Sequence, residues 1–388
     1  MDKFISDLES KTQELISGLP TTIRPWSLSH DLGQDRGALI TGPRGVGKTT
    51  FLLSQAKKHD RTLYFSADHP KANSVSLYTL GEEAFAKNYQ HLIIDEVHFA
   101  KDWAQNVKAL YDSFPKRKLW ISDSSSIILR KGSHDLSRRT PRLKMPLLSF
   151  REYLIVKTGN MLPTFNPFRG QSPVGPWNDF SAEQLMSEFK NYLIVGTRPF
   201  FLEGRYAEKS LAIIEKTIFS DVPYFLQNIQ SHHMSVMNSV MSYLSTSPVP
   251  TLNIDSLSRE WAIGKPKVYE LLSVMNELEL INVVRKKTDH SSGKGAKIFL
   301  ADPTWYHVLD GNTGSLREAF VATMFKGSNV PLFTTENDVL ADFSTPFGKI
   351  EIGGAKKGKK KADFVIRDDI HAITPSGAIP LWMVGCLY

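Results

Sequence analysis

A glycine-rich stretch near the start of the chain has the residue types and the spacing of a phosphate-binding loop. It consists of Gly42, Pro43, Arg44, Gly45, Val46, Gly47, Lys48 and Thr49, followed by Thr50. We interpret all of these as candidates for binding ATP, because glycines let the backbone wrap around phosphates and point successive N–H groups at them. Lys48 is expected to reach the β- and γ-phosphates, and the Thr49 hydroxyl to bind Mg²⁺. The structural alternative is a glycine-rich turn that only caps a helix.

An apolar run that ends in two acids supplies the second half of this candidate site. Residues 91–96 read HLIIDE, so Asp95 and Glu96 follow a predicted strand. Asp95 is expected to hold Mg²⁺ through water, and Glu96 to orient and polarise the water that attacks the γ-phosphate. Paired acids at a strand end also occur by chance. Their position after the glycine-rich loop favours an ATP-hydrolysing enzyme, and the glutamate separates it from a small-molecule kinase.

Polar and basic residues farther along are candidates to sense or stabilise the γ-phosphate. A serine cluster follows the next predicted strand, and Ser122 or Ser124 is the candidate sensor; a serine-rich turn that caps a helix is the alternative. Arg138 and Arg139, ahead of Arg142, are candidates to stabilise transition-state charge in their own site or in a neighbour's. Arginines that only face solvent are the alternative.

Alternating apolar runs and helical segments must position these residues. The alternation indicates an α/β domain with a parallel sheet covered on both faces, over residues 1–157. The predicted elements are a helix at residues 49–58 and strands at 37–42, 63–65, 92–94 and 119–121.

Three further segments are predicted beyond this domain. Residues 158–230 begin in a loop or linker rich in Gly, Pro and Asn, and continue as helices at 182–195 and 206–228, typical of a helical lid. Residues 231–304 follow the order of a winged helix-turn-helix. Residues 305–388 read as a small α/β module.

The winged helix-turn-helix pattern carries charges of both signs. Lys265 and Lys267 begin its third helix, where contacts to duplex DNA are usual. The wing offers further basic residues for such contacts, which are Arg285, Lys286, Lys287 and Lys294. Against this, Glu270, Glu277 and Glu279 lie in the later part of the third helix and would repel phosphates if they faced the groove. Packing against the ATPase domain or a protein partner is the alternative.

Composition sets the class of protein. The chain has 388 residues, 41% of them hydrophobic and 22% charged, which predicts a soluble globular protein of two or three domains and excludes a disordered or fibrous chain. The net charge is +7, and a single lysine run carries five of the positive charges. A basic patch of this kind fits a polyanionic partner, although such a run is more often a solvated loop. The run consists of Lys356, Lys357, Lys359, Lys360 and Lys361.

Cysteine content and apolar segments bear on the compartment. Cys386 is the single cysteine, which excludes an intramolecular disulfide and a thiolate zinc site and indicates a reducing compartment. The first residues, MDKFISDLES, lack the basic start and apolar core of a signal peptide. No apolar stretch approaches the roughly 20 residues of a membrane span. We therefore expect a cytoplasmic protein that does not enter a membrane.

With these motifs in place, the chain resembles the predicted ATPases of the AAA+ superfamily that carry a C-terminal domain of unknown function related to PD-(D/E)XK nucleases. The motifs that carry the resemblance, over most of residues 37–154, are LITGPRGVGKTT, LYFSADHP, LIIDEVHFAKDW, SDSSS and PLLSFREYL. It implies an α/β fold with a P-loop NTPase sheet of AAA+/ASCE type, then the helical lid, the winged helix and the nuclease-like domain. NYLIVGTRPFF resembles the lid element that implies a nucleotide contact from Arg198 or Pro199, although Thr197 replaces the usual glycine.

The C-terminal part resembles the nuclease pattern in a degenerate form. The resemblance implies that Asp342 and Glu351 bind Mg²⁺ and that a lysine two residues beyond the glutamate positions the attacking water. That position is Gly353, with Lys356 or Lys357 as the substitute, and lost cleavage activity is the simpler interpretation.

These observations favour a cytoplasmic ATPase that uses ATP and Mg²⁺ and acts on duplex DNA through its winged helix. One alternative is a nucleotide-dependent signalling switch with protein partners, and another is an ATP-regulated nuclease. An oligomer is compatible with each.

Overall fold

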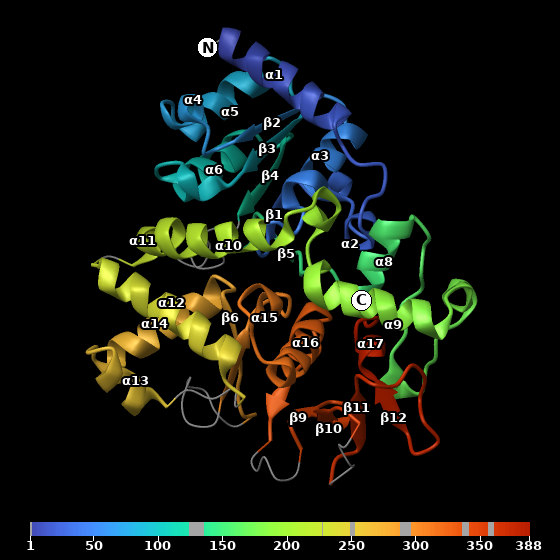
Figure 1. Ribbon diagram of the computed structural model, residues 1–388. Coiled ribbons are helices and arrows are strands. Elements are labelled where there is room, and N and C mark those ends of the chain that lie inside the picture. Colours follow the sequence, from blue (N-terminus) through green and yellow to red (C-terminus); the bar gives the residue numbers. More distant parts are fainter. Residues whose placement is uncertain are drawn as a thin grey trace. The chain divides into compact units, whose positions relative to one another are not determined.

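A computed structural model describes residues 2–123, 136–226, 228–248, 253–287, 296–335, 341–355 and 361–388 (Figure 1). The chain divides into two compact units, Met1–Met145 and Pro146–Tyr388, called here the first and second units. Each is described by itself. The finer division into four segments stays a prediction.

The first unit is built on a parallel sheet of five strands within its described residues. The strand order is β2-β3-β4-β1-β5, and every neighbouring pair is parallel. The strands are β1 Gly37–Thr41, β2 Thr62–Ser66, β3 His91–Asp95, β4 Lys118–Asp123 and β5 Arg142–Lys144. All residues of β1 are buried, as expected for a strand covered on both faces. The predicted parallel α/β sheet is confirmed.

Helices cover both faces of this sheet. Helices α1 and α3 lie on one side and α5 and α6 on the other (Figure 1). The Thr12 hydroxyl of α1 donates to the main-chain oxygen of Leu8 at 2.7 Å and accepts from the main-chain N–H of Tyr64 at 3.2 Å, which satisfies a polar group of the edge strand β2. The helices are α1 Asp2–Ser17, α2 Pro25–Leu28, α3 Lys48–Lys58, α4 Pro70–Asn73, α5 Leu77–Ala86 and α6 Trp103–Ser113, with 3₁₀ turns at Leu32–Gln34 and Val97–Phe99.

The second unit begins with helices. They are α8 Phe150–Thr158, α9 Ala182–Val195, α10 Tyr206–Lys216 and α11 Val222–Phe225, with 3₁₀ turns η3 Pro167–Arg169, η4 Gly175–Asp179 and η5 Pro199–Glu203. The α9 helix has the predicted bounds, and a Ser181–Gln184 capping box fixes its start. The single helix predicted at 206–228 is wrong in detail. A π-helical turn, η6 Thr217–Asp221, separates α10 from α11, just before Pro223, which has no N–H to donate.

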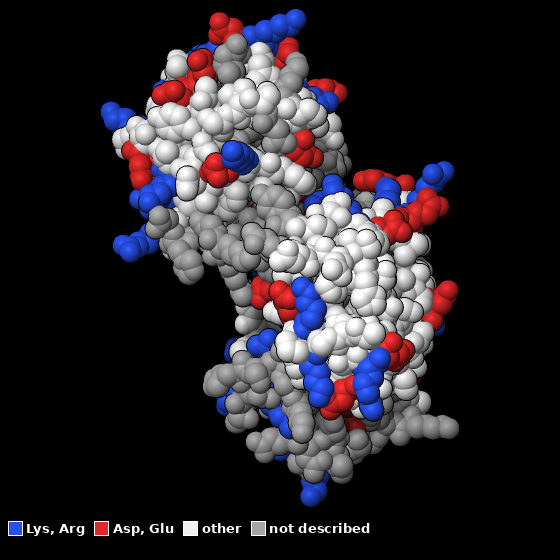
Figure 2. Space-filling model, turned by 90° about the vertical axis from the view of Figure 1, so that its left-hand side faces the viewer, with Lys and Arg blue, Asp and Glu red and all other residues white. Residues whose placement is uncertain are grey.

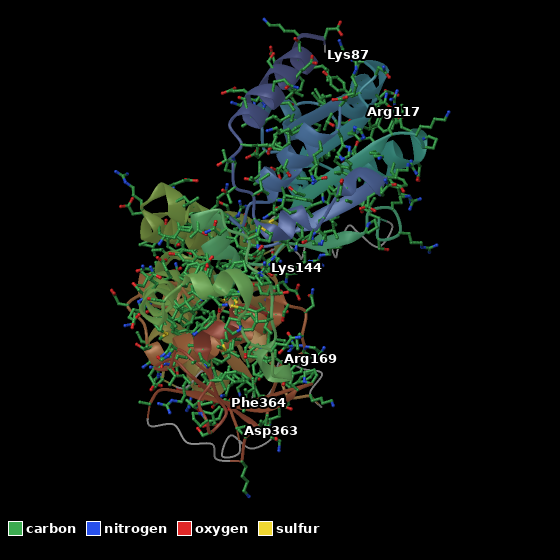
Figure 3. All side chains as sticks on the ribbon, turned by 90° about the vertical axis from the view of Figure 1, so that its right-hand side faces the viewer. Lys87, Arg117, Lys144, Arg169, Asp363 and Phe364 are labelled. Carbon is green, nitrogen blue, oxygen red and sulfur yellow. The ribbon has the colours of Figure 1, made fainter. Side chains whose placement is uncertain are left out.

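The Gly-, Pro- and Asn-rich start of residues 158–230, predicted as a loop or linker, is packed into the second unit. Its large aromatic residues are buried: Phe168 meets Phe364 of the C-terminal sheet edge-on, and Trp177 lies against Trp382 (Figure 3 labels Phe364). Glycines and prolines set the path of the backbone here, while the aromatic side chains supply the packing.

The next part of the second unit has the element order helix, helix, helix, strand, strand. The elements are α12 Ser231–Thr246, α13 Ile254–Glu260, α14 Lys265–Glu277, β6 Ile281–Val284 and β7 Lys297–Leu300. The strands β6 and β7 pair antiparallel, with Asn282 opposite Phe299. Pro266 occupies the first turn of α14, where its missing N–H costs nothing.

A five-stranded sheet and three helices follow within the described residues. The strand order is β12-β11-β10-β9-β8, with β8, β9 and β10 antiparallel and β10, β11 and β12 parallel. The elements are α15 Trp305–Val308, α16 Thr313–Gly327, β8 Phe333–Thr334, β9 Phe343–Thr345, β10 Gly348–Gly353, β11 Phe364–Arg367, β12 Ala378–Pro380 and α17 Leu381–Val384. The α16 helix contacts β6, β7 and β10, and thereby joins both sheets of this unit. No helix within the described ranges has both the length and the apolar character needed to cross a bilayer.

Candidate nucleotide site

The glycine-rich loop leaves the carboxyl end of β1 and leads into α3. Three of its glycines have positive φ, +150° at Gly42, +75° at Gly45 and +102° at Gly47, a region that side chains with a Cβ rarely enter. A Cβ at Gly42 would also overlap the main-chain oxygen of Met145. The loop therefore requires glycine at these positions, as the phosphate-binding pattern predicts.

Lys48 lies under this loop at the first turn of α3. Its side chain is 6% exposed, and Nζ donates to the main-chain oxygens of Gly42 at 2.8 Å and Pro43 at 2.9 Å. Burial lowers the pKa of the Lys48 ammonium, while the carboxylates of Glu96 and Asp95 oppose that shift. The ammonium is thus held at the mouth of the loop, and Thr50 lies in the same first turn of α3.

Asp95, at the end of β3, accepts hydrogen bonds on both carboxylate oxygens. Oδ2 accepts from the Thr49 hydroxyl at 2.6 Å and from the Tyr64 hydroxyl at 2.9 Å. Oδ1 accepts from the Ser122 hydroxyl and from the main-chain N–H of Glu96 at 3.1 Å. The structure therefore brings together three predicted site residues, Thr49, Asp95 and Ser122.

Oxygen atoms from two elements meet where Mg²⁺ is expected. Thr49 Oγ1 and Asp95 Oδ2 lie 2.6 Å apart, and a hydroxyl with a carboxylate is the hard oxygen donor set that Mg²⁺ prefers. The residues present fit the ion, which would be held by Thr49 directly and by Asp95 through water. A bound Mg²⁺ neutralises charge on the phosphates.

Glu96 follows Asp95 in a left-handed conformation, with φ of +51°, and so turns away from the strand direction. Its carboxylate lies 3.6 Å from Nη1 of Arg44, a loop residue. Burial raises the pKa of Glu96, and the positive charges of Arg44 and Lys48 oppose that shift. A carboxylate with a raised pKa beside the phosphate loop suits a general base.

Several residues near this site carry no sequence motif. Arg24, which precedes α2, is buried and donates from Nη1 to the main-chain oxygen of Val46 in the loop at 3.0 Å. His98 and Asp123 form a buried pair, with Nδ1 and Oδ1 2.9 Å apart, behind the ends of β3 and β4. The sequence offered a hint for two of these residues, because His98 lies two residues beyond the paired acids and Asp123 directly follows Ser122. It offered no hint that Tyr64 contacts Asp95, because an aromatic residue in a strand is equally typical of a hydrophobic core.

The candidate arginines are separated. Arg139 makes a two-bond pair with Asp112 of α6, at 2.8 and 2.9 Å, and its backbone lies against Gly37, at the edge opposite the loop. Arg138 is exposed beside it. Arg142 instead donates from Nε to the Thr41 hydroxyl at 3.0 Å, directly before the loop. Lys144, two residues on and labelled in Figure 3, pairs with Thr41 in the register of β1 and β5.

Within one chain, the structure therefore brings Arg142 to the loop and not Arg138 or Arg139. Their role in a neighbouring copy stays a prediction. Ser124, the second candidate sensor, lies outside the described residues.

The lid element GTRPFF belongs to the second unit, where its Thr197 and Arg198 contact Asp302. The Thr197 hydroxyl donates to Asp302, with both carboxylate oxygens at 2.9 Å, and the Arg198 guanidinium forms a fully buried ion pair with the same carboxylate. Tyr206 and Thr304 complete this buried polar network. Thr197 in place of glycine thus supplies a hydroxyl to the network, and the nucleotide contact from Arg198 or Pro199 stays a prediction.

The two acids of the nuclease pattern are both buried beside or within the C-terminal sheet. Asp342 directly precedes β9 and accepts a hydrogen bond from the Ile352 N–H at 2.7 Å, and Glu351 lies within β10. Lys297 of β7 donates to Glu318 of α16 at 2.8 Å and lies 3.4 Å from Asp342. Sequence reasoning missed Lys297 and Glu318. Lys356 and Lys357 lie outside the described residues, which hold no group of three or more His, Cys, Asp or Glu side chains arranged for a metal ion.

Comparisons with known proteins agree with the first unit. Residues 34–154 match a family model described as "AAA domain". No curated protein sequence matches the chain.

Among solved structures, the chain is similar to the Orc1 protein of Aeropyrum pernix in complex with DNA, with 12% identity over 80% of this chain and 91% of that chain and a TM-score of 0.29. It is similar to RuvB of Thermotoga maritima, with 13% identity over 79% of this chain and 96% of that chain and a TM-score of 0.32. It is similar to AMPPCP-bound DnaA of Aquifex aeolicus, with 14% identity over 69% of this chain and 86% of that chain and a TM-score of 0.25. The AAA-domain match and the parallel five-stranded sheet support an AAA+ superfamily assignment for residues 34–154, with nucleotide-dependent activity.

Proposed function

We propose that the first unit binds ATP with Mg²⁺ and hydrolyses it. The observation that carries the proposal is the 2.6 Å hydrogen bond from the Thr49 hydroxyl to Asp95 Oδ2. Thr49 directly follows the buried Lys48 and the glycine-rich loop. Residues from β1, α3 and β3 are thereby combined in the arrangement that phosphoryl transfer requires.

The roles of the residues follow from their positions. The main-chain N–H groups of the loop and the Lys48 ammonium bind the phosphates, while Thr49 and Asp95 hold the ion. Glu96 accepts a proton from the attacking water, and its raised pKa brings it closer to neutral pH than an ordinary glutamate. Ser122, which accepts from the Glu96 N–H at 3.3 Å and donates to Asp95, fixes the two acids relative to each other.

The test is the pair of variants Glu96→Gln and Lys48→Ala, with Glu82→Gln on the exposed side of α5 as the matched control. We expect Glu96→Gln to lower ATP turnover by about 100-fold or more while ATP still binds. Lys48→Ala should weaken ATP binding itself. Turnover that Glu96→Gln leaves unchanged would exclude the proposed role.

We further propose that the second unit acts on duplex DNA through α12–α14 and the β6–β7 pair, read as a winged helix. The element order and the exposed Arg285 and Lys287 after β6 support this. Lys265 and Lys267 at the start of α14 have acidic partners, Asp255 and Glu270. Positive and negative side chains are interspersed on the face drawn in Figure 2. The proposal therefore depends on a local contact surface and not on net charge.

Measuring the ATPase rate with and without duplex DNA tests this step. We expect duplex DNA to raise the ATPase rate. We also expect DNA binding by the double variant Arg285→Ala/Lys287→Ala to depend less steeply on salt concentration than binding by wild type. Lys190→Ala, a change of an exposed lysine on α9, serves as control. A different result would favour the alternative function. If Glu96→Gln abolishes ATP turnover but DNA neither binds to the protein nor stimulates turnover, the chain is a nucleotide-dependent switch with protein partners.

A further inference from the structure

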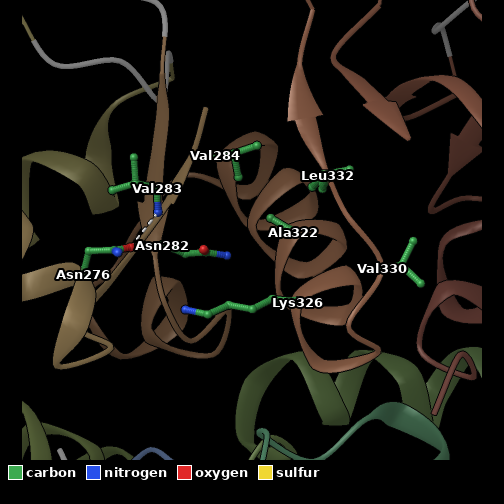
Figure 4. A pocket seen from close by; sticks show the side chains of 8 residues that line it. All are labelled: Asn276, Asn282, Val283, Val284, Ala322, Lys326, Val330 and Leu332. Atoms are coloured by element: carbon green, nitrogen blue, oxygen red, sulfur yellow. Dashed lines mark hydrogen bonds between the residues drawn. The ribbon is translucent and has the colours of Figure 1, made fainter. Parts of the chain in front are cut away.

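A pocket of about 280 Å³ lies in the second unit between the β6 strand and the α16 helix (Figure 4). Its walls come from the end of α14, from β6, from α16 and from the segment before β8. A volume of this size suits a small organic molecule. The pocket shares α14 and β6 with the proposed winged helix, but the basic residues proposed above to contact DNA, Arg285 and Lys287, do not line it.

Asn282 of β6 points its carboxamide into this pocket. The residue is only 6% exposed, and the pocket is the opening onto which its side chain faces. Figure 4 shows its side chain extending from β6 toward α16. A carboxamide offers two N–H donors and an acceptor oxygen, so a ligand in the pocket can take the place of the water that hydrates it.

Two further side chains make the pocket rich in donors. Asn276 uses its Oδ1 to accept from the Val283 N–H at 3.1 Å, which leaves its NH₂ group as a donor at the pocket wall. Lys326 extends from α16 back toward β6 (Figure 4), and its ammonium lies 3.9 Å from Glu279. An ammonium carries three donor hydrogens, so Lys326 can keep this ion pair while it donates to a ligand.

The remaining lining is aliphatic. It consists of Val283, Val284, Ala322, Val330 and Leu332. These side chains favour an alkyl group over a second polar group. A single ammonium that already faces Glu279 also does not balance the two charges of a phosphate monoester. The donors and the aliphatic walls together therefore select a monoanion with an alkyl body.

We propose that this pocket binds a small aliphatic carboxylate. The carboxylate accepts hydrogen bonds from Lys326 and from the NH₂ group of Asn282, and the alkyl chain packs against Val330 and Leu332. This is the arrangement of a small-molecule site, in which a few placed polar groups orient a ligand in an apolar cavity.

The test uses hexanoate as the probe and hexanamide as its neutral counterpart, with the full-length protein and a calorimetric titration. Wild type should bind hexanoate saturably, and hexanamide at least ten-fold more weakly, because only the carboxylate pairs with the ammonium. Lys326→Met and Asn282→Leu should each weaken hexanoate binding by at least five-fold, whereas Lys190→Met should not change it.

Lys326 is partly exposed, so its variant keeps the proposal testable if Asn282→Leu does not fold. The absence of saturable binding to wild type would overturn the proposal. Equal affinities for hexanoate and hexanamide, or hexanoate binding that Lys326→Met leaves unchanged, would overturn it as well.

Discussion

The phenol of Tyr64 on β2 donates a 2.9 Å hydrogen bond to Oδ2 of Asp95 on β3. In register Tyr64 pairs with Ile93, so the ring reaches two residues along the neighbouring strand. Burial raises the pKa of Tyr64, which keeps the phenol protonated and able to donate. Because Thr49 donates to the same oxygen, two hydroxyls fix the carboxylate orientation at the expected ion site.

Tyr64→Phe removes one of these two donors. We expect the free energy of unfolding to fall by about 2 kcal/mol, the usual loss for a hydrogen bond to a charged group. The Mg²⁺ concentration for half-maximal ATPase should rise several-fold, since Asp95 is less well oriented. Denaturant unfolding and a Mg²⁺ titration measure the two effects. Tyr78→Phe on α5 is the matched control, and equal Mg²⁺ requirements in both variants would contradict the role of Tyr64.

We expect substitutions of Arg142 and Arg139 to affect ATP turnover differently. Arg142→Ala should lower ATP turnover by about ten-fold, because its guanidinium bonds to Thr41 directly before the loop. Arg139→Ala should change turnover by less than two-fold in dilute protein, because Arg139 pairs with Asp112 at the opposite edge. Steady-state kinetics at saturating ATP compare the two. A large loss in Arg139→Ala that mixing with the Glu96→Gln protein restores would instead assign Arg139 to a neighbouring copy's site.

The strands and the loop of the first unit follow from local patterns. The apolar run of β1 and the glycines after it dictate a buried strand and a tight turn regardless of the rest of the chain, and β3 with Asp95 and Glu96 is equally local. Parallel strands then bring Thr49, Asp95 and Ser122 to one edge of the sheet. This part of the site was therefore predictable.

Contacts between distant side chains were not predictable. Arg139 and Asp112 are 27 residues apart, and nothing in either segment marks them as partners. Thr197 and Asp302 lie 105 residues apart and meet only because the second unit folds around them. Side-chain partners of this kind depend on tertiary packing, which a periodic pattern does not encode.

Asp302 should be a major stabilising residue of the second unit. It is fully buried and neutralises Arg198 while accepting from Thr197. Asp302→Ala removes the carboxylate that forms the buried ion pair with Arg198, and breaking such a pair typically costs about 3–5 kcal/mol. Adding Arg198→Met should recover part of the loss, since the buried guanidinium is then removed. Denaturant unfolding of the single and double variants measures this, with Asp179→Ala on an exposed turn as control. A double variant less stable than Asp302→Ala would contradict this explanation.

The second unit, which contains the acids of the nuclease pattern, should leave DNA uncleaved. One oxygen of Asp342 accepts from the Ile352 N–H at 2.7 Å, and the other faces the Lys297 ammonium at 3.4 Å. An ammonium thus already balances a carboxylate that the nuclease pattern needs for Mg²⁺. Incubation with Mg²⁺ and plasmid DNA, followed on a gel, should show intact plasmid for wild type and for Asp342→Ala. Cleavage by wild type that Asp342→Ala abolishes would favour the nuclease alternative.

Cys386 should make the stability of the second unit fall at alkaline pH. The thiol is fully buried, and burial raises its pKa well above the ordinary value, with Arg151 opposing the shift. In the unfolded chain the thiol loses its proton above about pH 8.5, whereas in the folded chain it stays protonated. Deprotonation therefore favours the unfolded state, and the free energy of unfolding falls as the pH rises above that value, at up to about 1.4 kcal/mol per pH unit.

Denaturant unfolding of wild type and Cys386→Ala at pH 7, 8, 9 and 10 isolates the contribution of the thiol to the free energy of unfolding. The difference between the two proteins should be constant from pH 7 to 8 and then change in the variant's favour; a constant difference up to pH 10 would show that the buried thiol carries no such linkage.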